Sequence, residues 1–129
     1  MNSVVQQLIH VLQGWDAVIR GICLVGCLGI LIGLFYVGGE PVAVGLFKPP
    51  MDKVVHFLTF GLITLLLWIA MLRGRPWLLV LIVACIGAAD EIHQMFLPGR
   101  SAGLDDFAFD FAGACVMTLL LSRIHRAAT

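Results

Sequence analysis

Apolar residues gather in four long runs, which are separated by short segments rich in proline, glycine and polar residues. The runs cover residues 17–37, 52–72, 77–97 and 105–122, and each is long enough to cross a bilayer as a helix. Few charged residues interrupt them. We therefore predict an all-α polytopic membrane bundle with four transmembrane helices.

Residues 4–16 show a different pattern, in which apolar side chains recur at helical spacing. Val4, Leu8 and Trp15 belong to this apolar set, whereas glutamines and a histidine lie between them. The pattern predicts an N-terminal amphipathic helix, which either lies at the membrane interface or extends the first span.

Turn-forming residues indicate where the spans end, and small residues indicate where helices can pack closely. Residues 38–51 carry three prolines and three glycines, which predict an ordered loop or re-entrant turn. Asp52 follows two prolines and is suited to cap the second span. Gly29 and Gly33 have a spacing that allows close helix packing. The chain after Ser122 is expected to form a basic tail.

The composition excludes a water-soluble fold. Of the 129 residues, 60% are hydrophobic and only 12% are charged, half the usual share in soluble domains. A chain of this length has too much surface for its volume to hide so much apolar side chain. The net charge is zero, so we expect no nucleic acid as a partner. We predict a single membrane domain over residues 1–129.

Basic residues favour one orientation in the membrane. Five arginines fall at the end that holds both termini and the loop between the second and third spans, whereas two lysines and one arginine fall at the other end. The positive-inside rule therefore predicts cytoplasmic termini. Trp15, Trp68 and Trp77 are expected at the inner interface and Tyr36 at the outer one, as in an aromatic belt.

The acidic residues point to a buried site. Seven of the eight fall in the outer half of this arrangement, and Asp90 and Glu91 lie inside the third span, roughly 10 Å below its outer end. A charge within a span costs on the order of 2.5–3.5 kcal/mol, and less near the interface, so neither carboxylate is expected to face lipid. Polar residues at similar depth elsewhere predict one pocket that opens outward. Its predicted lining is Asp52, Lys53, His56, Asp90, Glu91, His93, Gln94, Arg100, Asp106 and Asp110.

Several carboxylates close together in a low dielectric cannot all stay ionised and unpaired. They can pair with Lys53, Arg100 and the histidines, or retain protons and so be ready for acid–base chemistry. The third resolution is a divalent cation as cofactor. Its predicted ligands are Asp90, His93, Glu91, Asp106 and Asp110. Lys53 and Arg100 at the outer rim are also suited to hold a phosphate.

Three motifs follow one another in the second half of the chain. Residues 52–57 read DKVVHF, residues 90–100 read DEIHQMFLPGR, and residues 106–113 read DFAFDFAG. In this order and spacing they resemble the VanZ-like family of small bacterial membrane proteins, whose motif-bearing part corresponds to about residues 50–122. Asp110 stands where the family usually has Asn, which adds an acid to the site.

The resemblance implies a multi-pass protein of the bacterial cell envelope, placed in the inner (cytoplasmic) membrane. The name-giving member of the family is associated with resistance to the glycopeptide antibiotic teicoplanin. The resemblance adds no reaction. The polar positions of the family correspond to Asp52, Lys53, His56, Asp90, Glu91, Gln94, Arg100 and Asp106.

We expect the pocket to bind or act on a lipid-linked or phosphate-bearing envelope molecule, with membrane lipid around it. One of the catalytic candidates would act as general acid or base, and these candidates are Asp90, Glu91, His56 and Asp106. The candidates for substrate binding are Lys53, Arg100, Gln94, Asp52, Asp110 and His93. Two alternatives stay open, namely a small proton-coupled transporter or flippase and a non-catalytic envelope-binding accessory protein.

Overall fold

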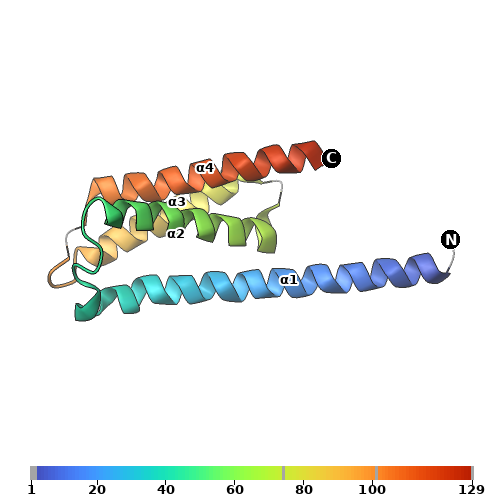
Figure 1. The fold of residues 1–129 in the computed structure, drawn as a ribbon, viewed down its shortest axis with the longest axis horizontal. Coiled ribbons are helices and arrows are strands. Elements are labelled where there is room, and N and C mark those ends of the chain that lie inside the picture. Colours follow the sequence, from blue (N-terminus) through green and yellow to red (C-terminus); the bar gives the residue numbers. More distant parts are fainter. Residues whose placement is uncertain (1–2, 74, 101, 129) are drawn as a thin grey trace.

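The described part of the chain folds into helices that are joined by turns and short irregular segments. The computed structural model describes residues 3–73, 75–100 and 102–128, and no β-strand occurs among them. The long helices are α1 (Ser3–Phe35), α2 (Met51–Leu67), α3 (Pro76–Gln94) and α4 (Leu104–Ala128) (Figure 1). Three short helical turns complete the fold, namely η1 (Val37–Gly39), η2 (Pro41–Ala43) and the π-helical η3 (Trp68–Leu72). The predicted all-α fold is confirmed.

Four helical stretches are long and apolar enough to cross a membrane, as predicted. They are Gly14–Gly39, Met51–Met71, Pro76–Gln94 and Leu104–Ala128. Helices α2 and α4 run in the same direction, and α1 and α3 run in the opposite one (Figure 1). Both described chain ends therefore lie at one end of the bundle, and the segments 36–50, 95–100 and 102–103 lie at the other.

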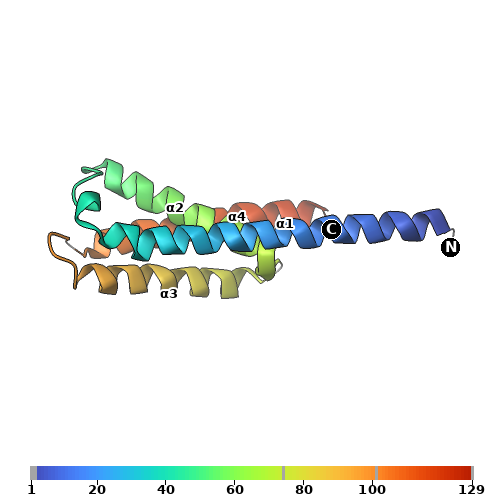
Figure 2. The same cartoon turned by 90° about the horizontal axis from the view of Figure 1, so that it is seen from below.

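The N-terminal segment continues into the first span without a break. Helix α1 is a single helix of 33 residues, and its first turns extend beyond the other three helices (Figure 2). The segment is therefore the predicted extension of the first span. The side chains of Val4 and Leu8, which belong to the predicted amphipathic face, lie outside the described part.

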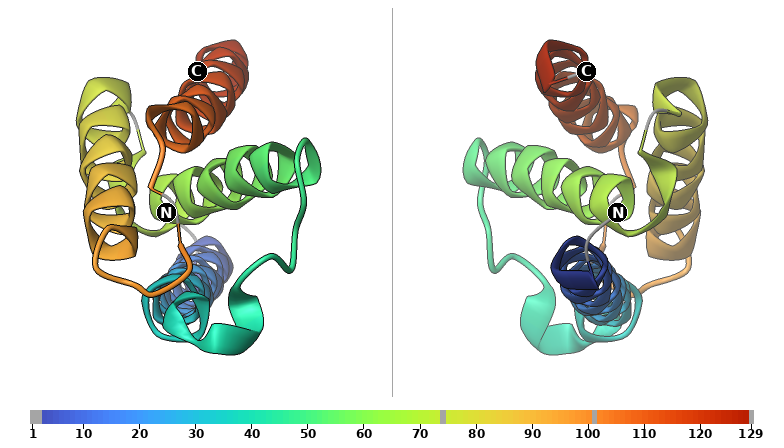
Figure 3. Two further views of the ribbon diagram at one scale, coloured as in Figure 1. Left: turned by 90° about the vertical axis from the view of Figure 1, so that its left-hand side faces the viewer. Right: turned by 90° about the vertical axis from the view of Figure 1, so that its right-hand side faces the viewer.

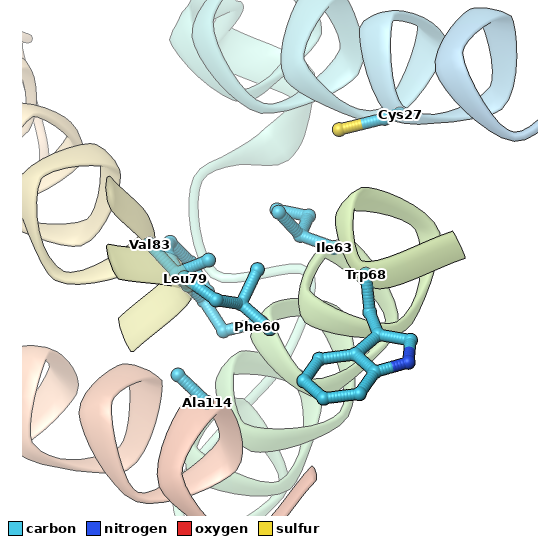
Figure 4. Close-up of a cluster of buried hydrophobic side chains, with 7 residues drawn as sticks. All are labelled: Cys27, Phe60, Ile63, Trp68, Leu79, Val83 and Ala114. Atoms are coloured by element: carbon cyan, nitrogen blue, oxygen red, sulfur yellow. The ribbon is translucent and has the colours of Figure 1, made fainter. Parts of the chain in front are cut away.

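Helix α2 occupies the centre of the bundle and packs against the other three helices (Figure 3). The buried apolar core combines side chains from all four long helices and from η3 (Figure 4). Its members are Cys27, Phe60, Ile63, Trp68, Leu79, Val83 and Ala114. This core lies toward the middle of the spans, so the polar residues are left to one end of the bundle.

Two of the tryptophans are exposed as an aromatic belt requires, and one is not. Trp15 and Trp77 keep 64% and 71% of their surface exposed. Trp68 is only 6% exposed, and its ring lies edge-on to that of His125 with the centroids 5.9 Å apart. Trp68 therefore belongs to the core and adds no exposed ring to the predicted aromatic belt.

The closest approach of two helices occurs between α2 and α4, at Gly61 and Gly113. A Cβ added to Gly113 would collide with the carbonyl oxygen of Phe57, and one added to Gly61 would lie 3.7 Å from the carbonyl oxygen of Gly113. Glycine has no side chain, so the backbones of two helices can approach this closely. No atom lies within 4 Å of a Cβ added to Gly29 or Gly33, so the close packing predicted for that pair does not occur among the described residues.

Three predicted helix ends differ from the structure. Helix α2 begins at Met51 with Pro50 in the capping position, so Asp52 lies in the first turn and is not the N-cap. Helix α3 ends at Gln94, since the following residues tighten into a turn ahead of Pro98, which disfavours a continued helix. Helix α4 continues to Ala128, so the predicted basic tail is helical.

Candidate functional site

Parallel helices α2 and α4 pair their polar side chains in one register. Lys53 Nζ donates a hydrogen bond to Asp106 Oδ1, and one turn deeper His56 Nδ1 lies 2.8 Å from Asp110 Oδ1. The partners are 53 and 54 positions apart in the chain. Gly113 continues the face of Asp106 and Asp110, so the close backbone contact there brings both pairs together.

Three carboxylates surround the ammonium group of Lys53. Besides its contact with Asp106, Lys53 Nζ lies 2.7 Å from Asp105 Oδ2 and 3.4 Å from Asp52 Oδ2. Asp105 was not among the predicted site residues, because a residue at the start of a helix is more often a cap. A phosphate held by Lys53 would have to share the ammonium group with these acids.

Asp90 and Glu91, in the last turns of α3, have different hydrogen-bond partners. Asp90 is only 1% exposed, and its Oδ2 accepts a hydrogen bond from Gln94 Nε2 at 3.0 Å. Glu91 Oε2 accepts a hydrogen bond of 2.7 Å from the backbone amide of Gly103, just before α4. Because α3 ends at Gln94, both acids lie nearer to the end of their helix than predicted.

A glycine on α3 makes room for Asp110. A Cβ added to Gly87 would lie 3.3 Å from both Cβ and Oδ2 of Asp110. The carboxylate of α4 therefore lies directly against the backbone of α3, one turn before Asp90. The sequence analysis did not single out Gly87, although a small residue one turn from a buried acid is a usable signal.

Four of the predicted residues form one compact group where α2, α3 and α4 meet. His56, Asp90, Glu91 and Asp110 each offer one ligand atom, and these atoms all lie within 4.8 Å of one another. Imidazole and carboxylate groups in this arrangement are able to hold a metal ion. We call these four residues the acidic cluster.

The acidic cluster lacks two of the predicted metal ligands and contains one residue that was not predicted as a ligand. It includes His56, whereas His93 and Asp106 are not part of it. Asp106 is engaged by Lys53, and the ring of His93 packs toward α1 with its centroid 5.5 Å from that of Phe35. Proximity on one helix therefore did not identify the histidine that joins the acids.

A polar cavity of about 300 Å³ lies beside the acidic cluster. Its polar lining is Asp52, His56, Thr59, Asp90, His93, Gln94 and Arg100. Apolar residues of α1 and of the segment after it close the other side, including Ile30, Leu34, Val37, Leu46 and Phe47. Two hydrogen bonds from Arg100, of 2.7 and 3.2 Å, reach the carbonyl oxygen of Gly38 and tie this wall to the loop after α3.

An apolar groove of about 430 Å³ lies between the end of α3 and the start of α4. Its lining is Ala88, Glu91, Ile92, Met95, Ala102, Gly103, Leu104 and Phe107. Ile92, Met95 and Leu104 are exposed, so the groove opens onto the outer surface of the bundle. Glu91 is shared between this groove and the acidic cluster.

Every predicted site residue lies at this end of the bundle, in one of three adjoining places. Asp52, His93, Gln94 and Arg100 line the polar cavity, and His56 and Asp90 belong to both the cavity and the acidic cluster. Glu91 and Asp110 complete the cluster, and Lys53 and Asp106 form the ion pair next to it.

Comparison with known proteins places this chain in a family. The model of the VanZ/LLP1 family matches residues 2–125, which is nearly the whole chain. The chain belongs to the VanZ/LLP1 family. No curated protein and no solved structure matches it. Membership confirms the resemblance predicted from the three motifs, and the match also includes α1. With its four apolar helices, this VanZ/LLP1 chain is a multi-pass membrane protein of the VanZ-like envelope type.

Proposed function

We propose that this protein binds a lipid-linked or phosphate-bearing molecule of the bacterial cell envelope, at the outer leaflet of the inner membrane. The proposal is carried by the position of Glu91, which borders an apolar groove on one side and belongs to a buried polar cluster on the other. An amphiphile needs an apolar and a polar binding surface within the length of one molecule, and both surfaces occur at this end of the bundle.

The groove supports binding of the hydrocarbon part. Its walls between α3 and α4 are almost entirely apolar, and its rim is exposed on the outer surface of the bundle, where we expect lipid tails. A chain in the bilayer can therefore enter sideways without crossing water. Sites for apolar ligands generally combine such walls with a few polar groups that fix the orientation.

The polar cavity supports binding of the head group. Arg100 and His93 line it, and two contacts from the Arg100 guanidinium to Gly38 hold its side chain in place. A guanidinium carries five N–H donors, so donors remain for a phosphate. Asp52 and Asp90 would repel an anion but can accept hydrogen bonds from hydroxyl or amino groups, which suits a head group that carries both kinds of group.

The outward orientation is supported by the distribution of charge. The opposite end of the bundle carries Arg20, Arg73, Arg75, Arg123 and Arg126. By the positive-inside rule this end faces the cytoplasm, which leaves the polar cavity and the groove at the outer leaflet. The lipid-linked intermediates of the envelope are reached from that side.

The proposal is tested with the purified protein in lipid nanodiscs. Two probes of equal chain length, a polyprenyl phosphate and the corresponding polyprenol, are compared by native mass spectrometry. We expect the phosphate to be retained more strongly, and Arg100→Gln to lose at least tenfold in that preference, because a charged hydrogen bond contributes about 1.5–3 kcal/mol and tenfold corresponds to about 1.4 kcal/mol. Arg123→Gln, at the opposite end, is the matched control.

Equal retention of both probes by the wild-type protein would contradict phosphate recognition. Because Arg100 also holds Gly38, thermal unfolding of Arg100→Gln is measured in parallel, and Arg100→Lys should restore part of the preference. Conversion of the bound lipid in detergent would establish an enzyme in which His56, Asp90, Glu91 or Asp106 moves a proton. Activity only in sealed vesicles with a gradient would instead indicate transport, and binding alone an accessory role.

A further inference from the structure

We propose that His56, Asp90, Glu91 and Asp110, the acidic cluster, bind one divalent metal ion at the junction of α2, α3 and α4. The four ligand atoms come from three helices and lie within 4.8 Å of one another. The inference goes beyond the proposed lipid binding and does not depend on it, because the ion can be tested without any lipid.

The spacing of the ligand atoms fits an ion. Metal–oxygen bonds of 2.0–2.6 Å place ligands on opposite sides of an ion about 4–5 Å apart. No two ligand atoms of the acidic cluster are more than 4.8 Å apart, which is compatible with that range. The side chains can therefore close on an ion without a shift of the helices.

Two carboxylate oxygens of the cluster lack any partner. Asp110 is 1% exposed, its Oδ1 meets His56, and its Oδ2 has no hydrogen-bond donor. Glu91 Oε1 is likewise buried without a donor. An unsatisfied buried acceptor costs free energy, and more so when it is charged. A bound cation would satisfy both oxygens, which no protein group described in the structure does.

The charge around the cluster is unbalanced. Lys53 is shared among Asp52, Asp105 and Asp106, and among the described residues neither Lys nor Arg pairs with Asp90, Glu91 or Asp110. Carboxylates this far from water need a counter-charge of some kind. A divalent ion supplies two positive charges at the point where the three carboxylates face one another.

Contacts from outside the cluster orient its ligands. Gln94 Nε2 donates to Asp90 Oδ2, and the amide of Gly103 donates to Glu91 Oε2. Gly87 leaves room for the carboxylate of Asp110 against α3. Metal ligands are usually held in place by a second set of hydrogen bonds of this kind.

The ligand types indicate the class of ion. Three carboxylates favour a hard ion such as Mn²⁺ or Mg²⁺, while the imidazole favours a transition metal such as Zn²⁺ or Mn²⁺. Mn²⁺ satisfies both preferences and is the probe of choice. An ion at this point would also offer a positive group to a phosphate that the carboxylates alone would repel.

The test uses the full chain, purified in detergent, stripped with a chelator and titrated with Mn²⁺ alone. Bound ion is counted by elemental analysis, and free Mn²⁺ is measured by electron paramagnetic resonance. We expect one ion per chain and a loss of at least 100-fold in affinity for Glu91→Gln and for Asp110→Asn, because each change removes a negative charge from a ligand and should cost more than the roughly 10–100-fold typical of changes around the ligands. Asp16→Asn, an acid-to-amide change at the opposite end, should bind as the wild type does.

Folding of each variant is checked by thermal unfolding with and without Mn²⁺. The wild type and Asp16→Asn should gain stability with Mn²⁺, whereas Glu91→Gln should not. Absence of a bound ion in the folded wild type, or equal binding by all three variants, would overturn the metal site. Loss of lipid binding with intact Mn²⁺ binding would leave the metal site standing and refute only the proposed function.

Discussion

His56 Nδ1 lies 2.8 Å from Asp110 Oδ1, across the interface of two helices that run in parallel. Asp110 is 1% exposed, so this contact joins an imidazole to a carboxylate away from bulk water. The pair connects the Lys53–Asp106 ion pair at the end of the bundle with Asp90 and Glu91 on α3. Through this pair, polar side chains of α2, α3 and α4 form one connected site.

Removing one partner of this pair should be worse than removing both. His56→Leu leaves the Asp110 carboxylate buried without its partner and is expected to lower the free energy of unfolding by about 3–5 kcal/mol. The double variant His56→Leu/Asp110→Leu should recover part of that loss. Unfolding in mixed micelles of increasing denaturing detergent measures both values. If the free energy of unfolding lost in the double variant equals the sum of the losses in His56→Leu and Asp110→Leu alone, the two side chains do not interact.

The contact between α2 and α4 predicts a sharp difference between two glycines. Gly113→Ala should lower the free energy of unfolding by about 1–3 kcal/mol, because its Cβ meets the backbone carbonyl of Phe57, which cannot rotate away. Gly29→Ala meets no atom within 4 Å and should be neutral or stabilising by up to about 1 kcal/mol. Thermal unfolding of both variants measures this difference. Equal effects on the two unfolding temperatures would argue against the close contact of α2 and α4 at Gly113.

Gly87→Ala should disturb the site without changing any charged residue. The new Cβ would press on Asp110 at 3.3 Å, and also on Phe60 at the same distance. We expect about a tenfold loss in Mn²⁺ affinity, as for other changes around metal ligands, with only a small change in the unfolding temperature. Unchanged Mn²⁺ affinity would mean that Asp110 is not held in place by α3.

The orientation in the membrane gives a prediction for reporter fusions. A periplasm-dependent phosphatase fused after Thr129 should be inactive, and the same enzyme inserted near Gly45 should be active. Gly45 lies in the segment between α1 and α2, at the end that carries the site. The reverse pattern would place the polar cavity in the cytoplasm and refute binding at the outer leaflet.

Much of the fold could be predicted because the membrane limits the choices. Four apolar runs permitted only helices, and buried acids such as Asp90 and Glu91 had to face protein. Asp106 and Asp110 lie one turn apart, so their shared face could be predicted from spacing alone. The convergence of these groups at one end of the bundle followed from the alternating direction of the spans.

The partners within the site could not be predicted, because they depend on contacts between distant segments. The register of α2 against α4 is set by the glycine contact at Gly113, which the sequence pattern did not distinguish from the open Gly29. That register brings His56, and not His93, next to the buried acids. Asp105 pairs with Lys53 across the same interface of α2 and α4, a contact that its position at the start of a span did not reveal.

The central claim is that a lipid-linked phosphate binds between α3 and α4, with its head group next to the acidic cluster. Photo-crosslinking tests this most directly, with a polyprenyl phosphate that carries a diazirine on its hydrocarbon chain. We predict crosslinks on Ile92, Leu104 and Phe107, which an excess of unlabelled polyprenyl phosphate suppresses and polyprenol does not. Crosslinks confined to the exposed face of α1, or insensitive to this competition, would contradict the account.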